Sequence, residues 1–330
     1  MNLGLIGFGG VGKSFVKLLK IKEELLSEVK LNYIIKSNGG VYNPEGLDIN
    51  YIIDYIDNDI KLEKHPQWKD ITIDNIIENR DIDCLIELTS TNIKDGEPGY
   101  THIKKALINN IHVVTGNKGP ILYYYKELKS IADNNNISLK VGCTTGGALP
   151  SINVGDNCFK GSKIIEIQGV LNGTSNYIIE EMKNSKITYI EALKKAQSLN
   201  IAELNPSLDV SGYDTAIKMK IISNVIMDLD IEIKDIYVEG IVNLTLNEIE
   251  NAESKNKKIK LIGKISTENK TYIIEVKPQL IDEYHPLYYV DGKNKGVYYK
   301  TDTLGDLTII GGASSPSNAA ASILRDLISI

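Results

Sequence analysis

GLIGFGGVGKSF, residues 4–15, decides the fold of the first part of this chain. A short apolar run leads into three glycines spaced Gly-x-Gly-x-x-Gly, and a helical pattern follows them. Glycine at these positions allows a tight turn, close approach of the backbone to a pyrophosphate, and packing of the helix on the strand. The helix N-terminus then faces the phosphates. We therefore predict that the cofactor is bound by Gly7, Phe8, Gly9, Gly10, Val11 and Gly12.

The residues beyond this turn continue the same alternation. Apolar runs at 3–7, 31–36, 83–89, 111–116 and 137–142 are separated by amphipathic helical stretches. Continuous apolar strands that alternate with helices are typical of a parallel sheet covered on both faces. We predict a doubly wound α/β domain of the Rossmann type over residues 1–141.

The pattern changes after Pro150. Strands are predicted at 163–171 and 272–278, and helices at 189–200 and 214–227. We expect a second, α+β domain over residues 142–304. Residues 305–330, a small-residue turn followed by a helix, are expected to return to the first domain.

Composition limits the classes of function. The chain has 330 residues and a formal charge of −6, so it carries no electrostatic footprint for nucleic acid or for an anionic membrane. It has no apolar run of membrane-spanning length and no leader pattern at its start. Three cysteines are too few for a disulfide framework. We predict a cytoplasmic protein.

The end of the second predicted strand bears on the choice of cofactor. An acid in this region would bind the ribose 2′-hydroxyl of NAD, but the sequence there has Lys36 and Ser37. This favours NADP, or the use of both cofactors. The alternative is that Lys36 is a solvated surface lysine without a role.

AELNPSLDVSGYDTAIK, residues 202–218, is the candidate catalytic segment. Pro206 and Gly212 bound a loop with several acidic residues, and a helix follows. Asp214 and Lys218 are four residues apart, so they share one helical face. Such a pair is usually a surface ion pair, but the neighbouring carboxylates suit a site that binds an ammonium group.

The acids, glycine, proline and lysine of this segment resemble the signature of the homoserine dehydrogenases. The pattern is Glu203-x-x-Pro206-x-x-Asp209-x-x-Gly212-x-Asp214-x-x-x-Lys218. VLNGTSNYII (170–179), GNKGP (116–120) and GEP (96–98) also resemble motifs of that family. The resemblance covers nearly the whole chain. It implies NAD(P)-dependent interconversion of L-homoserine and L-aspartate 4-semialdehyde, in threonine, methionine and isoleucine biosynthesis.

The resemblance also implies a role for individual residues. Lys218 would exchange a proton with the substrate hydroxyl. Asp214 and Lys118 would join it in catalysis, with Lys118 between cofactor and substrate. The resemblance assigns homoserine binding to Glu203, Asp209, Asp214, Gly173 and Thr174. It assigns further cofactor contacts to Lys118, Thr89, Ser90, Gly311 and Gly312.

A family member of this length is expected to lack an aspartate kinase module and an ACT regulatory domain. It is expected to be a homodimer whose interface is the sheet of the second domain, with strands near 163–171, 236–242 and 272–278. The second domain is then both catalytic and dimerising.

The segment VGCTTGGALP, residues 141–150, allows two interpretations. Cys143 resembles the thiolate of the phosphorylating aldehyde dehydrogenases, such as aspartate-semialdehyde dehydrogenase, but no later histidine has a suitable context. In the homoserine dehydrogenases the corresponding loop binds Na⁺ or K⁺. That role implies a weak cation site at the carbonyl oxygens of Thr145, Gly147 and Leu149, because Gly142 replaces the usual acid. Cys143 is then a packing residue.

A second alternative is a non-catalytic regulator that binds NAD(P). The retained Glu203, Asp214 and Lys218 argue against it, because a sensor needs no lysine for proton transfer.

Overall fold

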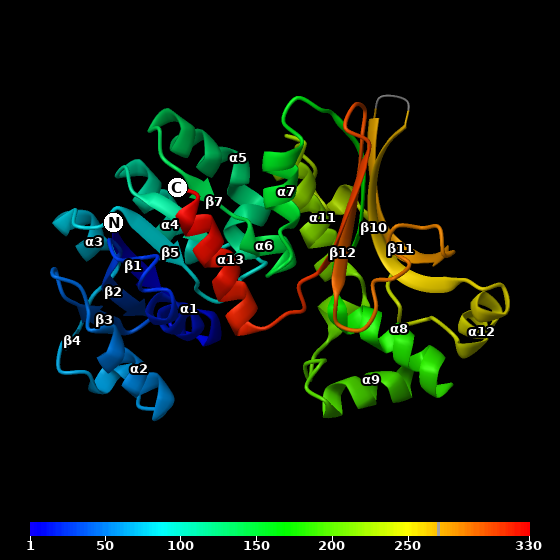
Figure 1. Cartoon of the computed structure of the whole chain (residues 1–330), viewed down its shortest axis with the longest axis horizontal. Helices are drawn as coiled ribbons and strands as arrows, with labels where there is room; N and C mark the ends of the chain where they lie inside the picture. The colour runs from blue at the N-terminus through cyan, green and yellow to red at the C-terminus, as the bar shows by residue number, and fades with distance from the viewer. Residues whose placement is uncertain (269–270) are drawn as a thin grey trace. The chain divides into compact units, whose positions relative to one another are not determined.

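The computed structural model describes residues 1–268 and 271–330, which form two compact units (Figure 1). The first unit contains Met1–Gly147 and Ser315–Ile330, and the second contains Ala148–Ser314.

The first unit is built on a seven-stranded sheet in the order β4-β3-β2-β1-β5-β6-β7. The strands are β1 (Asn2–Ile6), β2 (Lys30–Lys36), β3 (Gly39–Tyr42), β4 (Trp68–Lys69), β5 (Cys84–Glu87), β6 (His112–Thr115) and β7 (Leu139–Lys140). The five predicted strands are β1, β2, β5, β6 and β7, and they are parallel. The prediction of a doubly wound parallel sheet is confirmed. It omitted β3 and β4, two short antiparallel strands at one edge.

Helices cover this sheet. They are α1 (Gly10–Ile21), α2 (Ile49–Asp57), α3 (Ile73–Asn79), α4 (Gly99–Ile108), α5 (Lys118–Asn134), the short α6 (Cys143–Gly146) and α13 (Pro316–Ile328), with a 3₁₀ turn at Leu62–Lys64. Helices α1 and α13 lie side by side (Figure 1). Each buries an apolar stripe, with Phe15 and Val16 on α1 and Ile323 and Leu327 on α13. The C-terminal helix is therefore part of the first core.

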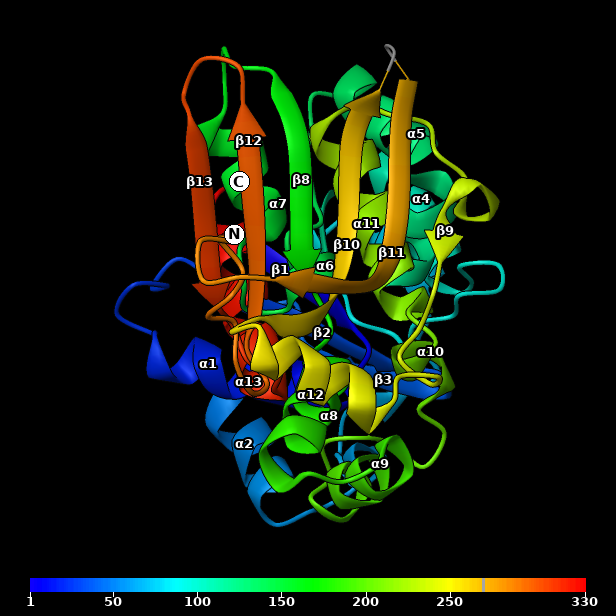
Figure 2. The same ribbon diagram turned by 90° about the vertical axis from the view of Figure 1, so that its right-hand side faces the viewer.

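The second unit has a six-stranded, mostly antiparallel sheet in the order β13-β12-β8-β10-β11-β9 (Figure 2). The strands are β8 (Ile164–Val170), β9 (Tyr237–Val238), β10 (Lys258–Glu268), β11 (Thr271–Ile281), β12 (Lys295–Thr301) and β13 (Asp306–Gly311). Strands β8 and β11 were predicted, whereas the long β10 and the pair β12–β13 were not. The α+β class of this unit is confirmed.

The helices of the second unit are α7 (Ser151–Cys158), α8 (Gly173–Ser185), α9 (Tyr189–Ser198), α10 (Ser207–Val210), α11 (Tyr213–Ile226) and α12 (Leu246–Ser254), with a 3₁₀ turn at Ile233–Asp235. Helix α11 crosses one face of the sheet. A side chain at Gly263 on β10 would collide with Met219 and Thr215 of this helix. The absence of that side chain lets α11 approach the sheet closely.

The boundaries of the units differ from those predicted. Residues 305–314 do not return to the first unit, because Asp306–Gly311 pairs with β12 as an edge strand of the second sheet. The return begins at Ser315. Residues 142–147 belong to the first unit, since Gly142 N–H donates to the buried carboxylate of Asp326 on α13 at 2.8 Å.

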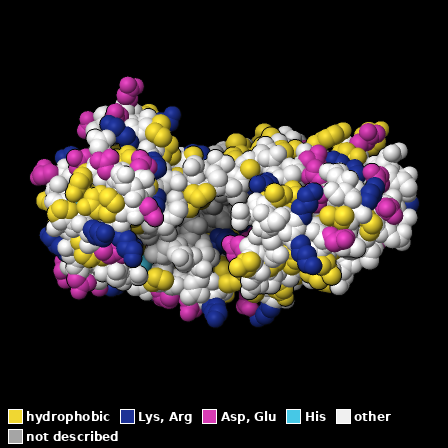
Figure 3. Space-filling view, turned by 90° about the horizontal axis from the view of Figure 1, so that it is seen from below, with side chains coloured by type: hydrophobic (Ala, Val, Ile, Leu, Met, Phe, Trp, Pro, Cys, Tyr) yellow, Lys and Arg dark blue, Asp and Glu magenta, His cyan; other side chains and the backbone are white. Residues whose placement is uncertain are grey.

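Basic and acidic side chains are interspersed over both units on the face that Figure 3 presents. Among the described residues, no helix combines the length and the apolar character needed to cross a bilayer.

Candidate active site

Helix α11 carries the two residues that the sequence placed on one face. Its N-cap, Gly212, has φ of +86°, a left-handed conformation that glycine adopts without strain. The helix is buried for most of its length, so Asp214 and Lys218 are only 7 % and 8 % exposed. The surface ion pair, the usual meaning of this spacing, is therefore wrong here.

Lys218 is held by two oxygen acceptors. Its ammonium donates to Asp214 Oδ2 at 2.5 Å and to the carbonyl oxygen of Leu171, at the end of β8, at 2.9 Å. Because an unpaired buried ammonium is very unfavourable, these acceptors hold the side chain in one position.

Asn172 connects the acids of the cluster. Its Nδ2 donates to Asp209 Oδ1 at 2.6 Å and to Asp214 Oδ2 at 2.8 Å. Its Oδ1 accepts from the N–H of Ser175 at 2.9 Å and so caps α8. One amide thus fixes the start of a helix and two carboxylates at once.

These groups line a cavity of about 220 Å³ in the second unit. Its wall includes Gly173 and Thr174 at the start of α8, together with Asp209, Asp214 and Lys218. The structure therefore brings together five of the residues expected to touch homoserine.

Two further lysines, Lys293 and Lys295, contribute to the same wall. Lys293 is exposed, and its carbonyl oxygen packs against Gly173, where a Cβ would come within 2.7 Å. Lys295 is 4 % exposed, and its ammonium donates to Ser314 Oγ at 2.7 Å. The cavity thus has carboxylates and ammonium groups, which suits a zwitterionic ligand.

Glu203 is the exception among the predicted substrate residues. It is exposed in the loop before α10, and it is not among the residues that line this cavity. Its neighbours Asn200 and Ile201 do line it. Its role stays a prediction.

The glycine turn of the first unit fits its expected purpose. Gly7 has φ of +103°, and a side chain there would collide with Leu88. A Cβ on Gly12 would collide with the carbonyl oxygen of Gly7, whereas a Cβ on Gly9 would have no neighbour within 4 Å. Gly7 and Gly12 are thus required by packing, and Gly9 leaves open space at the N-terminus of α1, as pyrophosphate binding needs.

A buried carboxylate organises the next two strand ends. Glu87, fully buried at the end of β5, accepts from the N–H of Thr89 at 3.1 Å, from the hydroxyl of Thr89, and from Thr115 Oγ1 at 3.1 Å. Asn117 donates to Thr89 Oγ1 at 3.1 Å and caps α5, whose first residue is Lys118. Thr89 and Lys118 therefore lie on one hydrogen-bonded framework.

Lys36 is not a free cation at the end of β2. Its ammonium donates to Glu63 Oε1 at 2.5 Å, and Asn38 reaches the same oxygen at 3.4 Å. The hydrogen bond from Lys36 holds the pKa of the Glu63 carboxyl below its usual value. Ser37 is exposed beside them.

The loop after β7 contains the cysteine. Cys143 is 8 % exposed, and its thiol lies 3.6 Å from the carbonyl oxygen of Ala319. Cys143 belongs to the apolar core of the first unit, as a packing residue would. Thr145 and Gly147 belong to the first unit and Leu149 to the second. Within the described ranges, no group of three or more His, Cys, Asp or Glu side chains could hold a metal ion.

The small-residue turn after β13 lies in the second unit. Gly311 and Gly312 have φ of +141° and +65°, and Ser314 lines the cavity that contains Lys218. Ser90 is exposed next to Thr89.

Sequence reasoning missed Asn172, Glu87, Glu63 and Lys295. Asn172 lies in the Asn-Gly-Thr loop that the sequence singled out, so its position before a predicted helix was an available signal. Glu87 and Lys295 lie within strands, where no local pattern distinguishes a charged residue that is buried.

Comparisons with known proteins identify the family. Residues 150–328 match the family model described as homoserine dehydrogenase, and residues 7–141 match the homoserine dehydrogenase NAD-binding domain. A homoserine dehydrogenase of Methanocaldococcus jannaschii is 35% identical, over 100% of this chain and 98% of the relative. An NAD(+)-dependent homoserine dehydrogenase of Pseudomonas canavaninivorans is 31% identical, over 100% and 96%.

Solved structures give the same result. The match to a structure from Archaeoglobus fulgidus covers 100% of this chain and 98% of the Archaeoglobus chain, with a TM-score of 0.89 at 30% identity. A hyperthermophilic archaeal homoserine dehydrogenase mutant in complex with NADPH covers 99% and 96%, with a TM-score of 0.86 at 25% identity.

Proposed function

The chain belongs to the homoserine dehydrogenase family, and from this premise we propose how its residues interconvert L-homoserine and L-aspartate 4-semialdehyde with a nicotinamide cofactor. The observation that carries the assignment of residues is the cavity in which Lys218, Asp214, Asp209 and Asn172 form one hydrogen-bonded cluster.

Lys218 exchanges the proton. In the oxidising direction the hydroxyl of homoserine gives its proton to the Lys218 amine, while the carbon that bears the hydroxyl loses a hydride. In the reducing direction the Lys218 ammonium protonates the aldehyde oxygen. The cofactor supplies or accepts the hydride at nicotinamide C4. Asp214 and the Leu171 carbonyl keep the Lys218 nitrogen in place during both.

The charged groups of the cavity bind the amino-acid end of the substrate. We assign Asp209 and Asp214 to the ammonium of homoserine and Lys295 and Lys293 to its carboxylate, because all four line the cavity together with Gly173 and Thr174. Glu203 would join Asp209 by a small movement of its exposed loop. We expect Glu203→Gln to raise KM for homoserine and to leave kcat nearly unchanged. An unchanged KM removes Glu203 from the site.

The cofactor would be held by Gly7, Phe8, Gly9, Gly10, Val11 and Gly12, and Thr89, Ser90, Gly311 and Gly312 would also contact it. Lys118, at the start of α5, would contact the nicotinamide or the substrate oxygen. Lys36 and Ser37 favour NADP. Because Glu63 offsets the charge of Lys36, the preference is modest and NAD is also used.

A monovalent cation, Na⁺ or K⁺, would be held by the carbonyl oxygens of Thr145, Gly147 and Leu149. The carboxylate that reaches this loop, Asp326, already accepts from Gly142 N–H. A shell of carbonyl oxygens alone holds a hard cation weakly. We therefore expect activity to depend little on the choice of salt.

The active protein is a homodimer that associates through the second sheet. Support comes from Ile273 and Tyr237, which are 43 % and 58 % exposed. By strand register they share the face opposite to Val276, which packs against the start of α11. Light scattering of the wild type and of Ile273→Lys tests this. A monomeric wild type would refute it.

One assay tests the function directly. Purified protein is given homoserine with NADP or NAD, in sodium, potassium or a bulky organic cation, and reduced cofactor is followed by absorbance. We expect turnover with both cofactors and a lower KM for NADP. Tight cofactor binding without turnover would favour a regulator, and phosphate-dependent oxidation of aspartate semialdehyde would favour the cysteine mechanism.

A further inference from the structure

A second cavity of the same unit lies apart from the Lys218 cluster. Its volume is about 230 Å³, and it is enclosed by α8, α12, the start of β10 and the loop at Asp291. Ile179, Ile249, Ala252 and Ile259 form its apolar wall. Four lysines and two carboxylates also line it, so it is positive in a chain whose formal charge is negative. We call it the lysine pocket.

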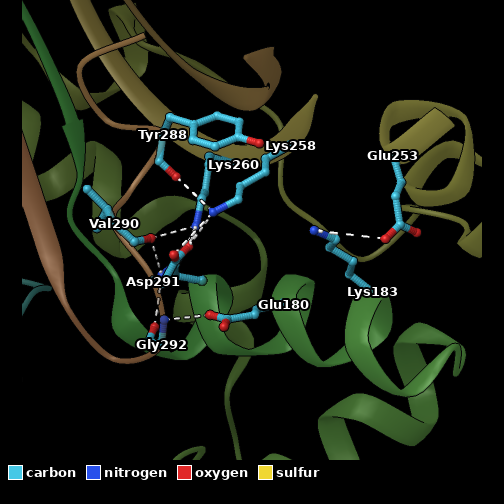
Figure 4. Close-up of polar contacts among 10 residues, drawn as sticks. Glu180, Lys183, Glu253, Lys258, Lys260, Tyr288, Val290, Asp291 and Gly292 are labelled. Atoms are coloured by element: carbon cyan, nitrogen blue, oxygen red, sulfur yellow. Dashed lines mark hydrogen bonds and ion pairs between the residues drawn. The ribbon is translucent and has the colours of Figure 1, made fainter. Parts of the chain in front are cut away.

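The two inner lysines stabilise the wall of the pocket (Figure 4). Lys260 is 3 % exposed and donates to Asn176 Oδ1 at 3.0 Å, to the Val290 carbonyl oxygen at 2.5 Å and to Asp291 Oδ1 at 3.1 Å. Lys258 donates to Asp291 at 2.9 Å and lies 4.4 Å from the centroid of the Tyr288 ring. These contacts fix the loop over the strand.

The two carboxylates of the pocket, Asp291 and Glu180, also form hydrogen bonds with groups of its wall. Asp291 accepts from both inner lysines, and Glu180 Oε2 accepts from the N–H of Gly292 at 2.5 Å. The lysines hold the pKa of Asp291 below its usual value, against the effect of burial. An ammonium group of a ligand would therefore compete with existing contacts for these acceptors. The pocket is unsuited to an amino acid.

The two outer lysines, Lys183 and Lys257, make fewer or longer polar contacts than the inner ones. Lys183 on α8 is 4.0 Å from Glu253 Oε1, and that carboxylate also pairs with Lys186. For the Lys257 side chain, no hydrogen bond or ion pair is found within residues 1–268 and 271–330. Two half-buried lysines thus line a cavity whose wall also has an aliphatic part, formed by Ile179, Ile249, Ala252 and Ile259.

We propose that the lysine pocket binds a small organic anion, with a carboxylate held by Lys183 and Lys257 and an aliphatic body against Ile179, Ile249 and Ala252. A carboxylate would give Lys257 an acceptor and Lys183 a closer one than Glu253 at 4.0 Å, and the apolar wall favours an organic acid over an inorganic anion. Asp291 and Glu180, the two carboxylates of the wall, already accept hydrogen bonds from it, so the pocket should bind zwitterions poorly.

The lysine pocket is connected to the catalytic cavity through α8 and residues 290–295. Asn176, which accepts from Lys260, donates to the carbonyl oxygens of Val290 and Gly292 at 3.0 and 2.8 Å. One turn earlier, Asn172 caps α8 and binds the catalytic acids, and the same loop continues to Lys293 and Lys295. Occupancy of the pocket is therefore expected to change KM for homoserine.

Calorimetric titration of the wild-type protein tests the binding, with succinate, inorganic phosphate, glycine and putrescine as probes. We expect succinate to bind, phosphate to bind more weakly, and glycine and putrescine not to bind. Lys257→Gln and Lys183→Gln should each weaken succinate about tenfold, because each removes a charge-assisted hydrogen bond. Neither side chain is fully buried, so both variants should fold.

Lys255→Gln is the matched control, because Lys255 is an exposed neighbour outside the pocket wall and the variant should bind succinate like wild type. Equal loss in all three variants would indicate general charge attraction and overturn the proposal. Equal binding of phosphate and succinate, or unaltered binding in Lys257→Gln and Lys183→Gln, would also overturn it.

Steady-state kinetics tests the connection. Succinate should change KM for homoserine at least twofold in the wild type, and Lys257→Gln should need about tenfold more succinate for the same change. The same dependence on succinate concentration in both proteins would place succinate in the catalytic cavity and overturn the connection. This test rests on the proposed function, whereas the calorimetric test of binding does not.

Discussion

The cofactor turn and the Lys218 cluster build their binding space by opposite means. At Gly7–Gly12 the space exists because side chains are absent, and packing demands that absence at two of the three glycines. Around Lys218 it exists because side chains bind one another, with Asn172 between Asp209 and Asp214. The site at Gly7–Gly12 should therefore be damaged by substitutions that add atoms. The site around Lys218 should be damaged by substitutions that remove a hydrogen-bonding side chain. The predictions below test this difference.

The largest effect is expected for Lys218→Ala. Loss of the proton-transfer group should lower kcat by about 10²–10⁴-fold. Cofactor affinity, measured by fluorescence titration, should stay within about twofold, because the cofactor turn lies in the other unit. Lys194→Ala, an exposed lysine of α9, is the control and should be fully active. Near-normal turnover in Lys218→Ala would refute the assignment.

Substitution within the glycine turn should separate packing from binding. Gly12→Ala should lower both stability and cofactor affinity, because the new Cβ collides with Gly7. Gly9→Ala should leave the melting temperature unchanged and still raise KM for the cofactor about tenfold or more, since its Cβ enters open space beside α1. Unaltered cofactor KM in Gly9→Ala would show that this space is not used.

Asn172→Ala should break the side-chain cluster. With the amide gone, two carboxylates lose a shared donor, and we expect kcat/KM to fall about 10–100-fold. The lost helix cap adds a cost of about 1 kcal/mol to stability. Thr188→Ala removes the cap of α9 outside the cavity and should show the stability loss alone. Equal activity of the two variants would show that Asn172 only caps α8 and does not support catalysis.

A smaller effect is expected at Glu63. Glu63→Gln frees the charge of Lys36, so KM for NADP should fall a few-fold while KM for NAD stays constant. The pKa of Glu63 is lowered, so its carboxylate becomes protonated only at a pH below that at which an ordinary glutamate does. Protonation of Glu63 would leave the charge of Lys36 without its counter-ion. NADP selectivity of the wild type should therefore rise only in acid. A pH-independent selectivity would exclude the pair from cofactor choice.

The smallest effect is expected for Cys143→Ala. The thiol packs against α13 and the proposed mechanism does not use it, so kcat should stay within about twofold while stability falls slightly. Loss of turnover with a normal melting temperature would favour the alternative in which Cys143 is the nucleophile.

Local patterns predicted the first unit well. Strands β1 and β5 each bury a continuous apolar run, and the Gly7–Gly12 turn follows β1 directly, so this signal lies within a few residues. The pattern also predicted α11 and the partnership of Asp214 with Lys218.

Contacts between distant residues could not be predicted in the same way. Strand β10 begins KIKLIG within a lysine-rich stretch, which resembles a solvated face, yet Lys260 is buried because Asn176 and Asp291 accept from it. The pairing of Lys36 with Glu63 joins residues 27 positions apart. Neither partner carries a local sign of the other.

The position of α13 has a consequence for the order of folding. The chain leaves the first unit after Gly147 and re-enters it at Ser315, so the second unit is an insertion. Its two ends meet, since a Cβ on Gly312 would come within 2.5 Å of Leu149 N. During synthesis the second unit can close as soon as it emerges, whereas the first must wait for Ile323 and Leu327 to complete its core. The half of the molecule that is made first is therefore finished last.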